Sequence, residues 1–276
     1  MRRATLFGRF GSYAALLFAA LLILFPIYWM ATTSLKLPRD ILRTPSLWPH
    51  AVTWNNYRIL IADKGFLTAI RTSVIVSATV TVVSVAIASL AAYSLARFRT
   101  RFRGLIGRLI LFAYLTPTSL LFIPLSIVMA QLGLGDSLAG LVLVYLTFSL
   151  PLGTWLLQSY FRSVPRELEE QGTIDGLSRL GALFRIVLPL SAPGLAAVAI
   201  FTFTGAWNEL LLALVLITSE SKRTAPLALN FLITSDTLPY GPLMAGAVLS
   251  SVPLMILYFI AQRFMVQGMT AGGVKG

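Results

Sequence analysis

The sequence predicts an all-α membrane protein with six transmembrane helices. Hydrophobic residues make up 57% of the 276 residues and charged residues only 12%, whereas soluble domains contain roughly 25% charged residues. A helix needs about 20 consecutive apolar residues to cross the hydrocarbon of a bilayer. Five windows without any charge exceed that length, and a sixth is interrupted only by Glu209. The five windows are residues 10–35, 72–96, 109–135, 137–161 and 237–262, and the sixth is 186–219.

We place the spans at residues 12–35, 72–96, 109–131, 138–160, 189–217 and 242–262, within a single transmembrane domain that covers residues 1–276. The N-terminal sequence MRRATLFGRFGS is basic and leads into a long uncharged stretch. That stretch is longer than the roughly 7 to 15 apolar residues of a signal-peptide core. It therefore indicates a first span that is retained in the protein.

Basic residues gather at the edges of the predicted spans and set the expected orientation. With the N-terminus inside, fourteen of the 22 lysines and arginines lie on the cytoplasmic side and seven lie outside, with Arg71 at a boundary. This excess follows the positive-inside rule and predicts that both termini are cytoplasmic. The net charge of +12 is thus explained without a nucleic-acid partner. An alternative role for the basic cluster 97–103 is contact with anionic lipid head groups.

Residues 36–71 form a predicted outer segment between the first and second spans. Thr53 is a favourable N-cap residue, so a short helix is expected to begin there. His50 lies in the same segment and is the only histidine, and the chain has no cysteine. Because no second histidine or cysteine exists to share a metal ion, we expect His50 to be solvated and no metal to bind.

Prolines mark the third and fourth spans. Span three contains Pro117 and Pro124, and span four contains Pro151 and Gly153. Proline leaves backbone carbonyl groups free, and hydroxyls, water or neighbouring helices must satisfy them. We therefore expect span three to be broken where it meets protein or a cavity. Kinks that line a pathway and the ordinary kinks of membrane helices are both compatible with this pattern.

Span five carries Trp207, Asn208 and Glu209, and Glu209 is the one acidic residue inside a predicted span. An ionised carboxylate at the centre of a membrane helix costs about 2.5 to 3.5 kcal/mol on insertion scales. Its side chain is therefore expected to face protein or water, and these three residues are our candidates for a substrate pathway. Two structural alternatives stay open: Glu209 pairs with a neighbouring helix, or it lies near the outer interface.

The loop between spans four and five, residues 162–188, holds four of the ten acidic residues of the chain. Pro165 suits the first turn of a helix, and the carboxylates that follow it favour a helix N-terminus. Gly172 is expected to interrupt this helix, and the Asp175-Gly176 pair is expected to form a turn. A second helix should follow, with one small or apolar face formed by Leu177, Leu180, Gly181, Phe184 and Leu188. The pattern predicts a helix, a turn and a second helix outside the bilayer.

This loop resembles the EAA loop of the permease subunits of binding-protein-dependent type I ABC importers. The resemblance rests on Glu170, Gln171, Gly172, two further residues, Asp175 and Gly176, and then on Phe184 and Leu188-Pro189. Gln171-Gly172 replaces the Ala-Ala of that family and Leu177 replaces the alanine after Asp-Gly, and the glycine is expected to loosen the helix. Residues 53–57, 91–98, 205–209 and 262–276 are similar to the carbohydrate branch of the family, which includes maltose and glycerol-phosphate-like systems.

The resemblance implies a type I ABC importer permease fold and one half of the pathway for a sugar, polyol or glycerophosphate-type solute. It implies as partners a homologous second permease, two ATP-binding subunits and an extracytoplasmic substrate-binding protein, in the plasma or inner membrane of a bacterium or archaeon. ATP would be bound by the partner ATPase subunits, with no cofactor on this chain. Coupling to the ATPase would involve Glu170, Gln171, Gly172, Asp175, Gly176, Leu177, Phe184 and Pro189.

The residues themselves do not predict an enzyme. A phosphate-binding P-loop needs a lysine directly after a glycine, and none of the four lysines follows a glycine. The single histidine lies outside the predicted spans, where it cannot serve an intramembrane protease. One alternative remains, an ion-coupled secondary transporter in which Glu209 is the coupling residue. Against it, the sequence shows no convincing inverted repeat.

Overall fold

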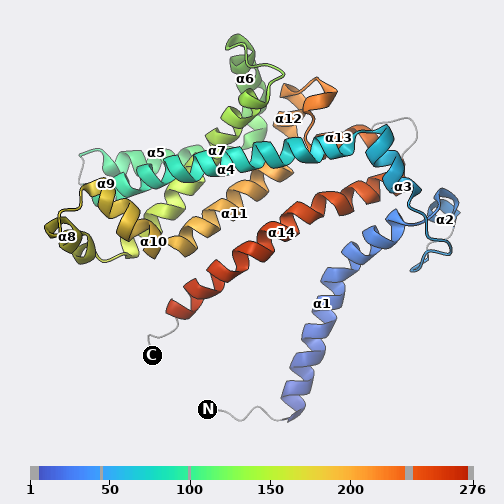
Figure 1. The fold of residues 1–276 in the computed structure, drawn as a ribbon, viewed down its shortest axis with the longest axis horizontal. Helices are drawn as coiled ribbons and strands as arrows, with labels where there is room; N and C mark the ends of the chain where they lie inside the picture. Colours follow the sequence, from blue (N-terminus) through green and yellow to red (C-terminus); the bar gives the residue numbers. More distant parts are fainter. Residues whose placement is uncertain (1–5, 44–45, 99–100, 234–238, 273–276) are drawn as a thin grey trace. The chain divides into compact units, whose positions relative to one another are not determined.

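The computed structural model describes residues 6–43, 46–98, 101–233 and 239–272, and every regular element in these ranges is a helix (Figure 1). The predicted all-α class is thereby confirmed for the described part of the chain. The described residues fall into two compact units. The first comprises residues 1–67 and 229–252, and the second comprises residues 68–228 and 253–276.

The first unit contains α1 (Leu6–Ser34), α2 (Pro38–Arg43), α3 (Asn55–Arg58) and the π-helical turn η1 (Ile59–Asp63), together with the first part of α14 (Tyr240–Gly272). The last carbonyl groups of a helix lack partners within it. Here the buried Asn56 side chain donates hydrogen bonds to the carbonyl oxygens of Ser34 (2.8 Å) and Lys36 (2.9 Å). The end of α1 is therefore fixed by a residue of the outer segment.

The short helix that was expected at Thr53 begins two residues later. The N-cap position of α3 is Trp54, which makes no side-chain cap bond. The backbone N–H of Thr53 donates instead to Leu35 O (2.9 Å), which ties Thr53 to the end of α1. Its hydroxyl oxygen accepts a hydrogen bond from the Asn55 N–H (3.2 Å). The predicted N-cap residue thus lies just outside the helix that it precedes.

The second unit is built around α7 (Leu138–Ser163), which packs against α5 (Arg103–Leu115) and α11 (Ala192–Asn208) (Figure 1). α4 (Phe66–Arg97) joins the same core through Val76, Val80, Ala88 and Ala92. A Cβ atom at Gly153 would lie 3.1 Å from Ala88 Cβ and 3.2 Å from Val198 Cγ1. The glycine therefore lets α7 approach α4 and α11 closely.

Four described helices are long and apolar enough to cross a membrane, namely Gly11–Ser34, Phe66–Arg97, Leu138–Ser163 and Tyr240–Gln262. Two further pairs pass the same test but are bent, by 96° between Arg103–Leu115 and Thr118–Gln131 and by 80° between Arg179–Leu190 and Ala192–Asn208. The first bend lies at Thr116-Pro117, inside predicted span three, so that span is broken as expected. Pro124 and Pro151 lie within the continuous helices α6 (Thr118–Gln131) and α7.

Predicted span five is also divided. α11 ends at Asn208, Glu209 has an extended backbone, and the short helix α12 (Leu211–Leu216) follows. After α12 come the 3-10 turn η3 (Glu220–Lys222) and α13 (Ala225–Ile233). The one charged residue of the sixth hydrophobic window therefore stands where the helix stops.

Asp136 joins the turn between α6 and α7 to the segment that follows α12. Its side chain accepts hydrogen bonds from the N–H groups of Thr218 and Ser219 (both 2.9 Å), from the Ser219 hydroxyl, and from Lys222 Nζ (2.9 Å). Its backbone is left-handed, with φ 46°. These bonds, the Ser219 hydroxyl bond first among them, hold the pKa of Asp136 well below its usual value. The carboxylate is thereby kept charged, and it fixes two turns of the second unit to each other.

Candidate functional site

The EAA-like part of the sequence forms four short helical pieces, which we call the 164–190 segment. They are α8 (Arg166–Ile174), α9 (Arg179–Ala182), the π-helical turn η2 (Leu183–Val187) and α10 (Leu188–Leu190). Glu167 and Glu169 lie in the first turn of α8, where negative charge complements the helix dipole. The predicted order of helix, turn and helix is present.

Gly176 closes the turn between α8 and α9. Its φ is +89°, a left-handed conformation that glycine adopts without the strain of a Cβ atom. The N–H of Leu177 donates to Gly172 O (2.9 Å) and the N–H of Gly176 donates to Thr173 O (3.1 Å). This pair of bonds is the Schellman pattern that satisfies the last carbonyls of a helix. Asp175 and Gly176 thus end α8, as the sequence predicts.

Gly172 does not interrupt α8, so that prediction was wrong, whereas the expected loosening of the helix stays a prediction. α8 continues through it to Ile174. Gly172 is buried, and a Cβ atom there would lie 2.7 Å from Ile186 Cδ1 and 3.1 Å from Leu177 Cδ1. The missing side chain lets the two halves of the segment pack closely. The cost of glycine in a helix is therefore offset by a contact that the linear sequence does not reveal.

The apolar face expected for the second helix is not the buried side of the segment. Leu180 and Phe184 are 57% and 60% exposed. The buried residues are Ala182, Leu183 and Val187. η2 explains the difference, because its i to i+5 hydrogen bonds place one more residue in the turn than an α-helix has. The helical phase therefore shifts in the middle of the segment, and two large apolar side chains are left on its surface.

The structure gathers most of the predicted coupling residues on the surface of the segment. Of that set, Gly172 is buried and Leu177 is partly buried. The others are exposed, namely Glu170, Gln171, Asp175, Gly176, Phe184 and Pro189. Ile174, which was not in the predicted set, is 86% exposed at the end of α8. Its position beside the Gly176 turn was the signal that could have added it.

Sequence reasoning missed a polar cluster behind α8, which we call the Arg97–Glu169 junction. Arg97 Nε lies 2.5 Å from Glu169 Oε1, and the two side chains are only 9% and 12% exposed. Tyr93 donates a hydrogen bond to Glu169 Oε2 (2.8 Å). Arg97 had been counted only as one of many cytoplasmic charges, and Glu169 only as a carboxylate of a first helical turn. A separation of 72 residues leaves no local pattern that pairs them.

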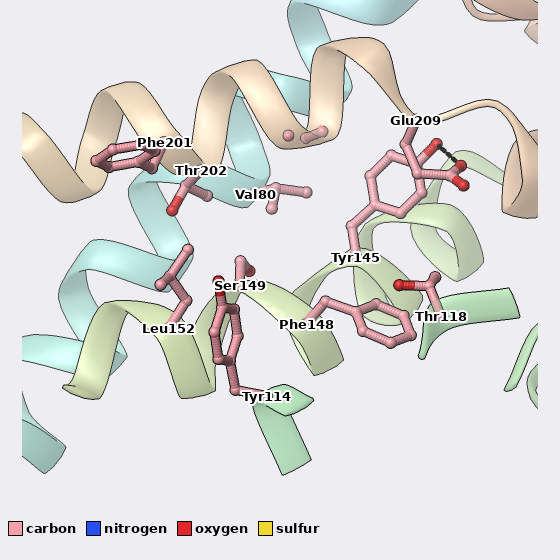
Figure 2. A pocket seen from close by; sticks show the side chains of 12 residues that line it. Val80, Tyr114, Thr118, Tyr145, Phe148, Ser149, Leu152, Phe201, Thr202 and Glu209 are labelled. Carbon is pink, nitrogen blue, oxygen red and sulfur yellow. Dashed lines mark hydrogen bonds between the residues drawn. The ribbon is translucent and has the colours of Figure 1, made fainter. Parts of the chain in front are cut away.

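A cavity of about 230 Å³ lies between helices of the second unit (Figure 2). Its wall is made by α4, α5, α6, α7 and α11 and by Glu209. Side chains with hydroxyl groups and aromatic rings face one another across it. The lining residues are Val80, Tyr114, Thr118, Tyr145, Phe148, Ser149, Leu152, Phe201, Thr202, Gly205, Ala206 and Glu209.

Glu209 sits at one end of this cavity with its carboxylate fully engaged. Figure 2 shows Tyr145 directed at it, with a hydrogen bond of 2.8 Å from the phenol to Oε2. The backbone N–H groups of Leu212 and Ala213 also donate to the carboxylate, at 3.0 to 3.2 Å. Glu209 therefore caps the start of α12, where free N–H groups need acceptors. Tyr145 is a further residue that sequence reasoning missed.

The other two residues proposed for the pathway lie elsewhere. Trp207 is buried and stacks on Phe203, with ring centroids 5.8 Å apart. Asn208 is exposed, and its side-chain amide donates to Thr204 O (3.0 Å). Neither lines the cavity. Of the predicted triplet, only Glu209 reaches it.

Two buried hydroxyl groups in the cavity wall lack partners. Within the part of the chain that the structure describes, Ser149 Oγ and Thr202 Oγ1 make no hydrogen bond. Buried polar groups in proteins normally find a partner in protein or water. The two oxygens have almost no accessible surface, so the side chains must shift before a molecule in the cavity can bind them.

Comparison with known proteins agrees with this geometry. Residues 84–271 match the family described as "Binding-protein-dependent transport system inner membrane component". The sulfoquinovosyl glycerol transport system permease protein SmoH of Agrobacterium fabrum is 39% identical over 254 residues, which cover 92% of this chain and 89% of that protein. The trehalose transport system permease protein SugB of Mycobacterium tuberculosis is 36% identical, covering 92% and 93%.

Among solved structures, a chain of a bacterial ABC transporter involved in the import of the acidic polysaccharide alginate has the same fold. The TM-score is 0.80 at 24% sequence identity, and the match covers 95% of this chain and 99% of that chain. The two sequence relatives are both permeases of carbohydrate transport systems. The chain therefore belongs to the binding-protein-dependent transport system inner membrane components and is a carbohydrate ABC transporter permease with the type I importer permease fold.

Proposed function

We propose that this chain forms one half of the pathway of an ATP-driven importer for a sugar, polyol or glycerophosphate-type solute. In this proposal the chain crosses the membrane six times as a single permease domain, with both termini in the cytoplasm. The four unbroken candidate spans and the two bent pairs support six crossings. The excess of basic residues on one side supports the orientation. The membrane is the plasma or inner membrane of a bacterium or archaeon, as for the relatives.

The observation that carries the coupling proposal is the exposed apolar surface of the 164–190 segment. Ile174, Leu180 and Phe184 are large apolar side chains on a segment predicted to lie outside the bilayer, and all three are mostly exposed. Exposed apolar side chains that lie together on a water-facing surface mark an interaction site. Glu170, Gln171 and Asp175 are exposed polar residues of the same segment. This combination supports docking of an ATPase subunit on the segment.

The remaining partners follow from the family. We propose a homologous second permease subunit, two ATP-binding subunits that bind the ATP, and an extracytoplasmic substrate-binding protein. A structure of a bacterial alginate ABC transporter in complex with an alginate pentasaccharide-bound periplasmic protein has a chain that resembles this one, with a TM-score of 0.66. The chain itself then carries neither a cofactor nor catalytic residues.

The cavity supports a hydroxylated solute. Ser149 and Thr202 are hydroxyl-bearing residues of its wall, and Tyr114 and Phe148 contribute aromatic rings. Glu209 closes one end of this wall while it caps α12. We therefore keep Glu209 as the pathway residue, in a role that shapes the cavity, whereas Trp207 and Asn208 lie outside its wall. An ion-coupled carrier is less well supported, because the relatives are ABC transporter permeases.

The test is purification of the intact complex, with mass spectrometry of its subunits and of the small molecule held by the binding protein. Ile174→Glu and Phe184→Glu are expected to lose the ATPase subunits from the complex while the permease still inserts. Val52→Glu, the same change at an exposed apolar residue of the outer segment, is the matched control and should retain them. ATPase subunits that stay bound to both segment variants would contradict docking at this surface.

A further inference from the structure

We propose that Arg97, Glu169 and Tyr93 act as positioning residues that fasten the 164–190 segment to the end of α4, so that movement of the segment is transmitted into the membrane helices. This inference rests on the proposed function, in which the segment receives the ATPase stroke. It assigns a role to three residues that join α4 to the segment and that are not among the exposed apolar residues of the docking surface.

Arg97 connects three elements at once. Its Nε donates to Glu169 Oε1 on α8, and its Nη2 donates to the carbonyl oxygen of Val164 (2.9 Å). Val164 is the residue at which α7 ends. A planar guanidinium can hold two acceptors in a fixed geometry, which an ammonium group cannot do. Arg97, the last residue of α4, therefore binds both the start of the 164–190 segment and its first helix, α8.

Tyr93 adds a connection to the second helix. It lies one turn before Arg97 on α4, and its hydroxyl is 2.8 Å from Glu169 Oε2 and 3.2 Å from the carbonyl oxygen of Arg179. The Arg179 guanidinium lies 5.0 Å from the ring centroid of Phe98. The Phe98 ring in turn packs edge-on against Tyr93. Both α8 and α9 are thus bonded to the same end of α4.

Burial makes these connections stiff. Glu169 and Arg97 are almost fully removed from solvent, and electrostatic attraction is screened much less there than at an exposed surface. Beneath them, Ala92 and Ala96 share an apolar cluster with Leu183 and Val187 of the segment. Small residues allow the backbones to approach closely, so the segment rests directly on α4.

The segment is also connected to the membrane helices through the polypeptide chain itself, but that connection is bent. The segment continues into α11 through a break at Ser191, with an angle of 80° between the two helical pieces. α4, in contrast, is one helix of 32 residues, from the junction past Val80 in the wall of the cavity. A straight helix transmits a displacement with less loss than a chain with a break. The geometry therefore favours α4 as the element that couples the docking surface to the cavity.

The experiment compares Arg97→Gln, Glu169→Gln and Tyr93→Phe in the complete transporter, reconstituted in proteoliposomes with its binding protein and a solute that the wild type imports. The quantity measured is ATP hydrolysed per solute molecule imported, normalised to assembled complex. Glu167→Gln and Arg101→Gln are matched controls, because they make the same changes at exposed residues close by. We expect the ratio to rise at least about fivefold in the first two variants, the lower end of usual coupling between sites, and less in Tyr93→Phe. Both controls should match the wild type.

The double variant Arg97→Gln/Glu169→Gln separates positioning from general destabilisation. If the two residues act as one junction, the double variant is no worse than either single variant, whereas independent effects add. A ratio equal to the wild type in all variants would overturn the inference. The inference would also be overturned if the variants reduced the amount of assembled complex but left the ratio of ATP hydrolysed to solute imported unchanged in the complex that remains. Tyr93→Phe is the mildest change, so it should leave enough complex for this measurement. A wild-type complex without any ATPase subunit would instead overturn the proposed function, and this inference with it.

Discussion

Gly172 faces Ile186 so closely that a Cβ atom on the glycine would lie 2.7 Å from Ile186 Cδ1. The obstructing atom is the end of a flexible side chain, so alanine at position 172 is not forbidden. It must displace that methyl group and press on Leu177 Cδ1, which would lie 3.1 Å away. The contact explains why glycine stands inside a helix that is continuous from Arg166 to Ile174.

Gly172→Ala is therefore expected to depend on residue 186. In an Ile186→Val background, which lacks Cδ1, alanine should raise the free energy of unfolding by about 1 kcal/mol, because alanine is that much better than glycine in a helix. In the wild-type background the gain should be smaller or absent. Unfolding of the purified protein in detergent checks this, with Ile186→Val alone as the reference. An equal gain in both backgrounds would contradict the close contact.

Gly176→Val should disturb the turn without disturbing its surroundings. No atom lies within 4 Å of a Cβ atom at this position, but its φ is +89°. A side chain in the left-handed region costs roughly 1 to 2 kcal/mol, and more for a branched one. We expect normal membrane insertion and a loss of substrate-stimulated ATPase activity in the complex. Gly104→Val on α5 is the control, because it too has open space but no positive φ. Unchanged stimulation in Gly176→Val would show that the turn is not needed for coupling.

Single cysteines can establish the orientation, because the natural chain has none. Gln171→Cys on α8 and Val52→Cys in the outer segment are both at exposed positions. A membrane-impermeant thiol reagent should label residue 171 only from the cytoplasm and residue 52 only from outside. Labelling of residue 171 in intact cells would reverse the assignment of the 164–190 segment.

Glu209 is expected to tolerate glutamine better than alanine. Glutamine keeps an acceptor for the N–H groups at the start of α12, but it loses charge-assisted bonds of roughly 1.5 to 3 kcal/mol against about 1 for neutral ones. Uptake per assembled complex should therefore fall by up to about tenfold in Glu209→Gln. Glu209→Ala leaves Tyr145 and two N–H groups unpaired, so it should also lower the amount of complex.

Measurement of uptake against pH and ATP, normalised to complex, distinguishes the mechanisms at Glu209. An ATP-driven importer keeps uphill transport in Glu209→Gln. A proton-coupled carrier would lose it completely, since glutamine cannot release a proton. Normal uptake per complex in both variants would remove Glu209 from the pathway. Tyr145→Phe is the matched milder change, because it removes one of the donors to the carboxylate.

Asp136 should give the protein an acid-sensitive contribution to stability. Its pKa in the folded protein lies below its usual value because Ser219, Lys222 and Thr218 donate to the carboxylate. A lowered folded pKa adds stability above the pKa of the unfolded chain, about 3.9. That stability is lost as the pH falls through the folded value. Asn at this position tolerates the same left-handed backbone, so Asp136→Asn removes mainly the charge.

The expected result is a lower unfolding temperature for Asp136→Asn than for the wild type at pH 7. The difference should stay constant down to about pH 4 and shrink only below it. Thermal unfolding scans of both proteins from pH 7 to pH 3 provide the measurement. A difference that vanishes between pH 7 and pH 5 would point to another titrating group.

Much of this fold follows from local features of the chain. The helical class follows from long uncharged windows, since a membrane helix must satisfy its own backbone. The break at Thr116-Pro117 follows from proline chemistry, and the Gly176 turn from the conformational freedom of glycine. The resemblance of residues 170–189 to the EAA loop led to the family that the comparisons establish.

The features that could not be predicted depend on partners far away in the sequence. Gly172 is a weak helix residue until Ile186 is known to lie against it. Arg97 is one more basic residue at the end of a span until Glu169 is placed beside it, and Glu209 is an anomalous membrane carboxylate until α12 begins two residues later. Hydrophobic patterns and helix propensities are read from residues that are neighbours in the sequence. The roles of Gly172, Arg97 and Glu209, in contrast, come from packing in space.

The π-helical turn Leu183–Val187 has a consequence for how residues are matched between relatives. It holds one residue more than an α-helical turn, so the extra residue is accommodated there without a loop. Deleting a single residue there would restore a regular helix and rotate everything before it by about 100° relative to everything after it. A relative without the extra residue would present Leu180 and Phe184 in a different phase. An alignment without a gap at 183–187 would then equate surface positions of one protein with buried positions of the other.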